Sequence, residues 1–319
     1  MGFFLLIIFS VFAQVKVDSS QLSVSGISSG AQMATQLHIA YSDYFSGVGL
    51  IAGGPYGCAG GNALTAQYQC MKNDWGEPSV EILLGRAYFF EQIKRISNLS
   101  QIPDDKIFLL SGTNDQTVLP ENMLAAKVFY ESLGVTKIKS VFDMPVGHAF
   151  PTVSSGHDCD NAGKAPWLAA CGRNIAKEML SHLFQKKLKT KSAPTDNYYR
   201  YQQSDAVSMA REGVIYFPKS CFKKKCPLHI ALHGCAQNLE AVGNDFVMES
   251  GLNEVAEGSN LIILYPQTKA LGLINPHGCW DWWGYSGLNY LWRDSSQMSS
   301  ILNTVNKLIS GRLTLFPLF

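Results

Sequence analysis

Short apolar strands alternate with helical patterns along most of the chain, and this alternation constrains the fold more than any other feature. Runs of apolar residues predict strands over 21–25, 48–52, 106–110, 137–142, 213–217, 228–232 and 261–265. Apolar residues at helical spacing predict helices over 29–45, 121–133, 168–186, 242–257 and 294–310. Strands that alternate with helices imply a mostly parallel sheet with helices on both faces. The expected fold class is therefore α/β.

The composition is typical of a globular enzyme or binding protein. The 319 residues fit one large domain or two small ones, and 46% of them are hydrophobic, which is ample for a core. The formal charge of +1 argues against a nucleic-acid binder, which would need clustered Lys and Arg. Low charge with 28 Gly, 13 Pro and 6 Trp argues against disorder, collagen or coiled coil. The basic stretch at 186–198 is expected to be an exposed connection rather than a site for an anionic partner.

Residues 1–13 are almost wholly apolar, as in a secretory signal. The run is shorter than the roughly 20 residues needed to span a bilayer, so we expect no stable membrane insertion. Val11-Phe12-Ala13 resembles a cleavage site before Gln14, although the usual basic start is missing, and a buried strand is the alternative. We expect a signal over 1–13, an extracellular or periplasmic location, and one domain over 14–319 without a separate substrate-binding module after residue 310.

Eight cysteines support export to an oxidising compartment. Three couples lie close in sequence and one spans a longer distance: Cys58 with Cys70, Cys159 with Cys171, Cys221 with Cys226, and Cys235 with Cys279. Eight cysteines allow about a hundred connectivities, so proximity alone leaves the pairing open. Zinc is the competing use, but the spacings give no two CxxC knuckles and no His-x-x-x-His lies nearby. Disulfides are favoured, and no metal site is expected.

The run Gly26-Ile27-Ser28-Ser29-Gly30 places a G-x-S-x-G motif between a predicted strand and a predicted helix. In that context a sharp turn lifts the serine hydroxyl clear of the sheet, and the helix N-terminus offers free N–H groups to an oxyanion. Ser29 is the local alternative, but the pattern centres on Ser28. The motif predicts a nucleophile at Ser28.

A nucleophilic serine needs a base and an orienting carboxylate, which follow in the order Ser, Asp, His in this type of fold. Asp115 and His148 each follow a predicted strand, so both are expected at the sheet edge where Ser28 lies. Taken alone, each residue fits a turn or loop role, but their joint order and position favour a triad. Asp143 and His157 are the nearest substitutes.

The second oxyanion donor usually comes from a loop that precedes the nucleophile, but little chain precedes Ser28. The matching pattern occurs late, where the strand at 228–232 runs into His233-Gly234-Cys235, like the His-Gly-Gly loops of esterases. If this loop lies beside Ser28, the chain is a circular permutation of the usual order, with its first strands drawn from 210–265. Permutation is tolerated because domain termini tend to lie close together at the surface.

Four aromatic residues cluster at Trp280, Trp282, Trp283 and Tyr285. Core packing is the alternative role for such a cluster, and Trp280 fits it. Trp282 and Trp283 cannot both point inward on an extended segment, so at least one is expected to be exposed. Exposed aromatic side chains bind apolar surfaces.

Seven segments together, and in the right order, resemble the single-domain extracellular polyhydroxybutyrate depolymerases of the circularly permuted α/β-hydrolase type. They are SVSGISSGAQMATQLHIAYSD at 23–43, GGPYGC at 53–58, residues 114–118, GHAFPT at 147–152, LHGCAQ at 232–237, LIILYPQ at 261–267 and NPHGCWDWWG at 275–284. The resemblance runs through nearly all of residues 20–310. Ala31 and Gln32 depart from the family, which commonly has Gly-Tyr at these positions beside the nucleophile.

By this resemblance Ser28 is the nucleophile, Asp115 and His148 complete the triad, and the backbone N–H groups of Ser29 and Cys235 form the oxyanion hole. No cofactor is implied. The expected activity is that of a secreted serine esterase that hydrolyses poly(3-hydroxybutyrate)-type polyesters through an acyl-enzyme and releases hydroxyacid monomers or short oligomers. The expected partners are a polyester surface or a short-chain ester, and the expected state is a monomer.

Trp282 matches the family's substrate-contacting tryptophan, and we expect Trp283 and Tyr285 to contribute beside it. The cysteine couples also match the family's pattern, which implies a Cys235–Cys279 bridge between the oxyanion loop and the Trp-rich loop. Two other functions stay open: a feruloyl or acetyl esterase that acts on plant polysaccharide, and a non-catalytic surface-binding module of the same fold.

Overall fold

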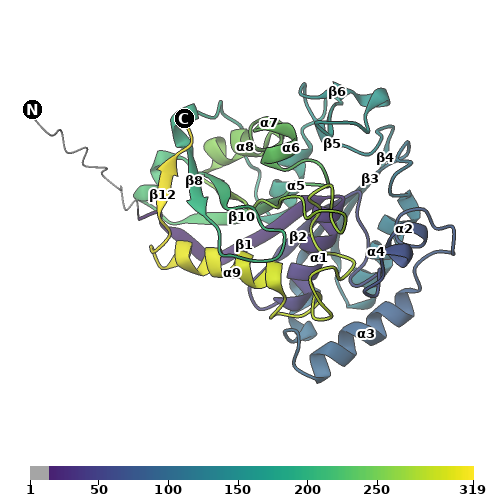
Figure 1. The fold of residues 1–319 in the computed structure, drawn as a ribbon. Helices are drawn as coiled ribbons and strands as arrows, with labels where there is room; N and C mark the ends of the chain where they lie inside the picture. Colours follow the sequence, from purple (N-terminus) through teal and green to yellow (C-terminus); the bar gives the residue numbers. More distant parts are fainter. Residues whose placement is uncertain (1–13) are drawn as a thin grey trace, which may run out of the picture.

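The computed structural model describes residues 14–319, and its centre is a nine-stranded sheet (Figure 1). The expected signal over 1–13 lies outside the described residues. In sheet order the strands are β12 (Leu315–Pro317), β8 (Tyr198–Gln202), β9 (Glu212–Tyr216), β11 (Ile262–Tyr265), β10 (Cys226–Leu232), β1 (Val17–Ile27), β2 (Gly47–Ile51), β3 (Lys106–Gly112) and β4 (Lys137–Met144). Adjacent strands in the part of the sheet from β11 to β4 are parallel. Adjacent strands from β12 to β11 are antiparallel. The predicted mostly parallel sheet is confirmed.

Helices cover both faces of this sheet, as the alternation of strands and helices predicts. One face carries α1 (Ser29–Ala40), α4 (Pro120–Ser132) and α9 (Ser296–Ile309), and the other carries α5 (Ile175–Leu183) and α8 (Leu252–Ser259). Figure 1 shows α9 and α8 on opposite sides of the strands. The remaining α-helices are α2 (Ala63–Tyr68), α3 (Val80–Gln92), α6 (Leu239–Val242) and α7 (Asp245–Glu249).

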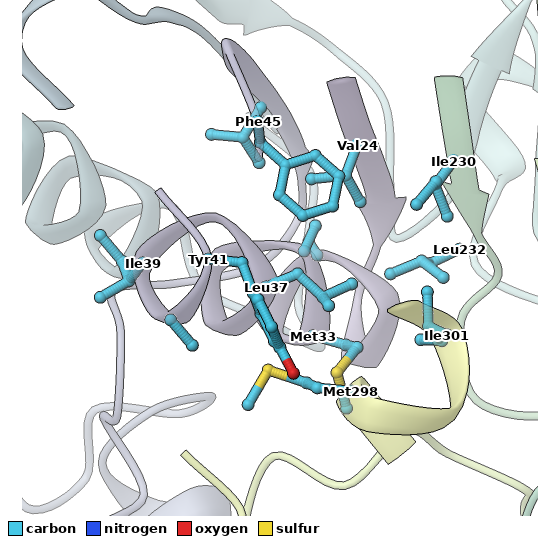
Figure 2. Close-up of a cluster of buried hydrophobic side chains, with 14 of the residues drawn as sticks. Val24, Met33, Leu37, Ile39, Tyr41, Phe45, Ile230, Leu232, Met298 and Ile301 are labelled. Atoms are coloured by element: carbon cyan, nitrogen blue, oxygen red, sulfur yellow. The ribbon is translucent and has the colours of Figure 1, made fainter. Parts of the chain in front are cut away.

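The two cores are separated by the sheet because successive strand residues point to opposite faces. In β11, Ile262 and Leu264 belong to the core under α1 and α9, whereas Ile263 and Tyr265 belong to the core under α5 and α8. Figure 2 shows part of the first core, where side chains of α1 and α9 meet those of β1 and β10. The labelled residues there are Val24, Met33, Leu37, Ile39, Tyr41, Phe45, Ile230, Leu232, Met298 and Ile301.

The prediction of a helix over 168–186 is wrong for its first residues. Leu168–Ala170 form a strand, β7, in a small sheet with β5 (Phe150–Thr152) and β6 (His157–Asp158). The helix itself is α5, which begins at Ile175 because the Asn174 side chain accepts the Lys177 N–H at 2.8 Å and caps its first turn. Apolar spacing alone does not distinguish three buried strand residues from the first turn of a helix.

The helix predicted over 242–257 is also divided. The chain forms α6, α7 and α8 there, and Gly251 between α7 and α8 has φ +80°, which breaks the helical path. The helix predicted over 29–45 ends earlier, at Ala40. The basic stretch at 186–198 joins α5 to β8 and is largely exposed, as expected, although Leu188 is buried.

The eight cysteines form four disulfides: Cys58–Cys70, Cys159–Cys171, Cys221–Cys226 and Cys235–Cys279. These are the couples that lie close in sequence and the one long-range couple. The longest loop, between Cys235 and Cys279, spans 44 residues. None of the helices over residues 14–319 is both long enough and apolar enough to cross a membrane.

Candidate active site

Ser28 lies on a sharp turn between β1 and α1, where the G-x-S-x-G motif predicts it. Its backbone has φ 57° and ψ −123°, a left-handed conformation that is strained for a residue with a side chain. The Ser28 N–H donates to the Ile51 carbonyl of β2 at 2.9 Å, which anchors the turn to the sheet. A Cβ on Gly26 would lie 2.2 Å from the Gly30 carbonyl, so only glycine allows the strand and helix to approach this closely.

Asp115 and His148 meet at the carboxyl edge of the sheet. Asp115 follows β3 and is fully buried; its Oδ1 accepts the N–H groups of Thr117 and Val118 at 2.8 and 2.9 Å. Its Oδ2 lies 2.8 Å from His148 Nδ1. A carboxylate in this position holds Nδ1 protonated and leaves Nε2 free to accept a proton. The alternative His157 instead bonds the Ala165 carbonyl, at 2.7 Å.

Ser28 and His148 line one cavity of about 570 Å³. No hydrogen bond joins the Ser28 hydroxyl to the imidazole within the described chain, and such contacts often tighten only around a bound substrate. The walls are mostly apolar and come from distant segments; they include Met71, Trp167, Ile274, Trp282 and Trp283. The cavity therefore combines a hydroxyl, an oriented imidazole and apolar walls.

Two backbone N–H groups beside Ser28 have no acceptor among residues 14–319: those of Ser29 and Cys235. Both neighbours of Cys235 are engaged, because Gly234 N–H donates to Gln237 Oε1 at 2.8 Å and Ala236 N–H donates to the His277 carbonyl at 2.7 Å. Unpaired N–H groups beside a nucleophile can stabilise a developing oxyanion. The pair is the one that the resemblance implies.

The loop after β10 is held against the start of α1. A Cβ added to Gly234 would lie 3.3 Å from the Ser28 Cβ, which shows how closely the loop approaches the nucleophile. Trp280 donates from its indole N–H to the His233 carbonyl at 3.0 Å, and the Cys235–Cys279 disulfide ties the same loop to the Trp-rich segment. The loop after β10 is thus positioned from two sides.

His233 in this loop is buried and neutral. Its Nε2 accepts the Thr268 N–H at 3.3 Å, so the proton is on Nδ1, which donates to the Gly234 carbonyl at 2.7 Å. Burial lowers the pKa of His233 to about 4, although the bond to Gly234 opposes this. A neutral imidazole keeps an extra positive charge out of the loop after β10 at ordinary pH.

Two of the four clustered aromatic residues line the cavity, and two do not. Trp280 is fully buried, as expected for a core residue. Trp282 and Trp283 both line the cavity, with Trp282 7% exposed and Trp283 half-buried. Tyr285 does not line it; its hydroxyl donates to the Cys279 carbonyl at 2.8 Å and its ring packs on Trp283. Tyr285 supports Trp283 from behind.

Two curated proteins match nearly the whole chain. A poly(3-hydroxybutyrate) depolymerase of Delftia acidovorans is 36% identical over 93% of this chain, which spans 61% of that relative. A polyhydroxybutyrate depolymerase of Talaromyces funiculosus is 33% identical over 92% of this chain and 91% of its own length. The chain belongs to the polyhydroxybutyrate depolymerase family. No family model matches it.

Solved structures of the polyhydroxybutyrate depolymerase family have the same fold. The crystal structure of the depolymerase from Penicillium funiculosum aligns with a TM-score of 0.85 and 32% identity over 93% of this chain and 98% of that chain. A serine-to-alanine variant of a PHB depolymerase, complexed with an R3HB trimer, aligns with a TM-score of 0.86 over the same shares. The α/β-hydrolase fold is thereby established for this chain.

Two residues of this depolymerase-family site were not predicted from the sequence. Gln237 is buried; besides accepting from Gly234, its Nε2 donates to the carbonyls of Pro166 and Trp167 at 3.0 and 3.3 Å. Trp167 lines the cavity and lies edge-on to His148, with ring centroids 6.3 Å apart. The bonds of Gln237 cross about 70 residues of sequence, for which no local pattern exists.

A buried histidine that no motif indicated lies between the two strands that end beside Ser28 and the loop at 233–235. His229 of β10 is bonded to Ser23 Oγ at 2.8 Å through Nδ1 and to Ser25 Oγ at 2.7 Å through Nε2. Complete burial lowers the pKa of His229 to about 3, so the ring is neutral at ordinary pH. His229 thus cross-links β1, which ends beside Ser28, to β10, which leads into the loop at 233–235.

Proposed function

We propose that this chain is a secreted serine esterase that hydrolyses poly(3-hydroxybutyrate)-type polyesters to hydroxyacid monomers and short oligomers. The observation that carries the proposal is the meeting, at one cavity, of Ser28, the His148–Asp115 pair and two N–H groups without acceptors. Each part alone has structural explanations. Together they supply the nucleophile, the base and the oxyanion donors that acyl transfer needs.

In the first half-reaction His148 Nε2 takes the Ser28 proton as the hydroxyl oxygen attacks the ester carbonyl carbon. The carbonyl oxygen becomes an oxyanion between the N–H groups of Ser29 and Cys235. His148 then gives its proton to the departing alkoxide, the carbon–oxygen bond of the ester breaks, and the acyl group stays on Ser28. Asp115 stabilises the imidazolium while it exists.

In the second half-reaction water replaces the alcohol. His148 takes a proton from the water, the hydroxide attacks the acyl carbonyl, and the same N–H groups hold the second oxyanion. His148 returns the proton to the Ser28 oxygen as the acyl bond breaks. The products are an alcohol, which carries the rest of the polyester, and a carboxylate.

The polyester substrate is supported by the relatives and by the shape of the cavity. The proteins that match the chain are named poly(3-hydroxybutyrate) or polyhydroxybutyrate depolymerases, and one solved relative is complexed with an R3HB trimer. The cavity in this chain is walled by Trp167, Trp282 and Trp283. Such walls suit methyl-branched aliphatic esters, which have little to offer but apolar surface and ester carbonyls.

We also propose that the described chain is one circularly permuted domain and acts as a monomer. If β8 to β11 are numbered 1 to 4 and β1 to β4 are numbered 5 to 8, the order of strands across the sheet is 1-2-4-3-5-6-7-8. The edge strand β12 lies outside this series. The oxyanion loop then follows the third strand and Ser28 follows the fifth, the relation that this hydrolase type requires. The four disulfides support an extracellular or periplasmic location.

The test is the Ser28→Ala variant. We expect it to lose hydrolysis of a p-nitrophenyl butyrate type of ester while it still adsorbs to polyester granules. Equal behaviour of wild type and variant on every ester would instead support the non-catalytic binding module. Clearing of a polyhydroxybutyrate suspension, compared with release of ferulate from bran, separates the polyesterase from the plant-polysaccharide esterase.

A further inference from the structure

The cavity holds one side chain with a permanent charge. Among the residues that line it within 14–319, Lys72 has an ammonium group, and none has a carboxylate. The other walls are mostly apolar, and the substrates proposed above are neutral along their length. A cationic side chain at the edge of an otherwise uncharged cavity can attract an anionic group of a bound ligand.

Lys72 is held in place by the backbone around it. The Cys58–Cys70 disulfide fixes the chain two residues before it. The Met71 carbonyl accepts the Leu119 N–H at 2.9 Å and the Asn122 side-chain amide at 3.2 Å. The segment is therefore tied to the start of α4, which lies beside α2 in Figure 1. Lys72 is a fixed part of the wall.

No ion pair within the described chain uses Lys72. Its Nζ donates to the backbone carbonyl of Gln116, which leaves further donor positions on the ammonium. Lys72 is half-buried as a whole residue and lines the cavity, while the bond from its ammonium to Gln116 is exposed.

The bond to Gln116 places the ammonium next to the Asp115 loop, and so on the His148 side of the site. His148 protonates the departing alkoxide, which means that the leaving alcohol lies on this side. In a hydroxyalkanoate polyester the leaving alcohol is the part of the chain that runs to the free carboxyl end. A terminal carboxylate is thus the anion that a productively bound chain brings towards Lys72.

We propose that Lys72 binds the free terminal carboxylate of a hydroxyalkanoate oligomer or chain end, on the leaving-group side of the scissile ester. This inference rests on the proposed esterase function and adds a specificity to it. A charge-assisted bond to the chain end favours cleavage near that end over cleavage at random positions. The soluble oligomers released from a polymer carry the same carboxylate and are favoured for the same reason.

The experiment compares two trimers of 3-hydroxybutyrate, one with its free carboxylate and one with that group replaced by a neutral carboxamide of similar shape. Internal ester cleavage is measured by product chromatography in wild type, Lys72→Met and Lys72→Arg. Lys187→Met, an exposed lysine outside the cavity, is the matched control for the loss of one positive charge. His277→Gln tests the other basic side chain at the wall.

We expect Lys72→Met to raise KM for the free acid roughly tenfold, with kcat and the carboxamide reaction nearly unchanged. Lys72→Arg should keep the preference for the acid, and Lys187→Met should behave as wild type. The same preference, measured by calorimetric binding of both trimers to the Ser28→Ala protein, should disappear when Lys72→Met is added.

An equal ratio of acid to carboxamide hydrolysis in wild type and Lys72→Met overturns the proposal, as does a preference abolished by His277→Gln alone. Both results leave the esterase function standing, because carboxamide cleavage by the wild type reports that function independently. Failure of the wild type to cleave either trimer overturns the esterase function itself.

Discussion

The α-carbon of Gly30 faces the carbonyl oxygen of His233 so closely that a Cβ at this position would lie 2.4 Å from it. The Leu232 carbonyl lies at the same 2.4 Å. Both neighbours are backbone atoms, so neither can rotate away. This contact brings the first turn of α1, with the Ser29 N–H, against the loop that carries the Cys235 N–H. Because Gly30 has no side chain, it allows the Ser29 and Cys235 N–H groups to lie this close together.

Gly30→Ala should separate these two segments. We expect a loss of kcat/KM of at least about 100-fold, the scale for one misplaced oxyanion donor, and a fall in unfolding free energy of about 1–3 kcal/mol. Gly85→Ala is the matched control, because Gly85 is also helical and has nothing within 4 Å of its would-be Cβ. It should keep full activity and gain about 0.5–1 kcal/mol. Normal ester kinetics in Gly30→Ala would contradict this account.

Asp115→Asn should lower kcat by roughly 10³–10⁴-fold with little loss of stability. The Oδ1 contacts to Thr117 and Val118 survive in asparagine, so the loop keeps its shape. The amide that replaces Oδ2 donates to His148 Nδ1 and places the imidazole proton on Nε2, where it can no longer accept from Ser28. Stopped-flow and steady-state ester hydrolysis measure the loss. Asp143→Asn, the exposed alternative, should retain the wild-type rate.

Removal of the Cys235–Cys279 disulfide by a double Cys→Ser substitution should affect catalysis and stability together. Closure of its 44-residue loop contributes roughly 4 kcal/mol in the chain-entropy model. We expect kcat to fall more than KM rises, because the loop that carries the Cys235 N–H loses its covalent tie. The double substitution at Cys221 and Cys226, which close a 5-residue loop, should cost about 2 kcal/mol and leave kcat unchanged. Equal losses of kcat in the two double variants would contradict a special role of the Cys235–Cys279 disulfide in catalysis.

Stability should fall as the solution becomes acidic, in part through His229 and His233. Burial lowers their pKa values to about 3 and about 4, whereas histidines in the unfolded chain titrate near about 6.5. Below about pH 6.5 these two histidines therefore bind protons in the unfolded chain but stay neutral in the folded chain. Each unit of pKa difference is worth about 1.4 kcal/mol, so the free energy of unfolding decreases between about pH 6.5 and pH 3.

Urea unfolding at pH 8, 6 and 4.5 measures this slope. His229→Asn, which removes one of the two groups, should show a shallower slope than the wild type. His277→Gln is the control, since His277 is exposed at the cavity wall and its replacement should leave the slope as it is. Identical slopes in wild type and His229→Asn would show that His229 does not contribute.

The layer order and the position of Asp115 and His148 at the sheet edge were predictable because they depend on signals that are local in sequence. Each parallel strand is a short apolar run, and the carboxyl ends of parallel strands share one edge. Asp115 and His148 could therefore be placed beside Ser28 without coordinates, and the structure joins them at 2.8 Å. The position of the loop at 233–235 beside Ser28 was also predictable, because the segment 228–235 has its own strand-to-loop signature.

The errors and omissions concern residues whose role depends on distant partners. The strand at 168–170 exists because β5 and β6 lie beside it, and apolar spacing does not contain that information. Gln237 bridges Gly234 to the chain at 166–167, and Tyr285 points its hydroxyl at Cys279 rather than into the cavity. Glutamine and tyrosine have many possible roles, so only the packed neighbours decide which one applies.

The central position of β1 in the sheet also bears on when this protein first becomes active during its synthesis. Ribosomes make Ser28 early, but β10, which pairs with β1 along its length, and the Cys235 N–H come about 200 residues later. At roughly 5–20 residues per second this delay lasts about 10–40 seconds, and the nascent polypeptide lacks the Cys235 N–H during that time. On the proposed function, Ser28 therefore lacks one of its two oxyanion donors until most of the chain has left the ribosome.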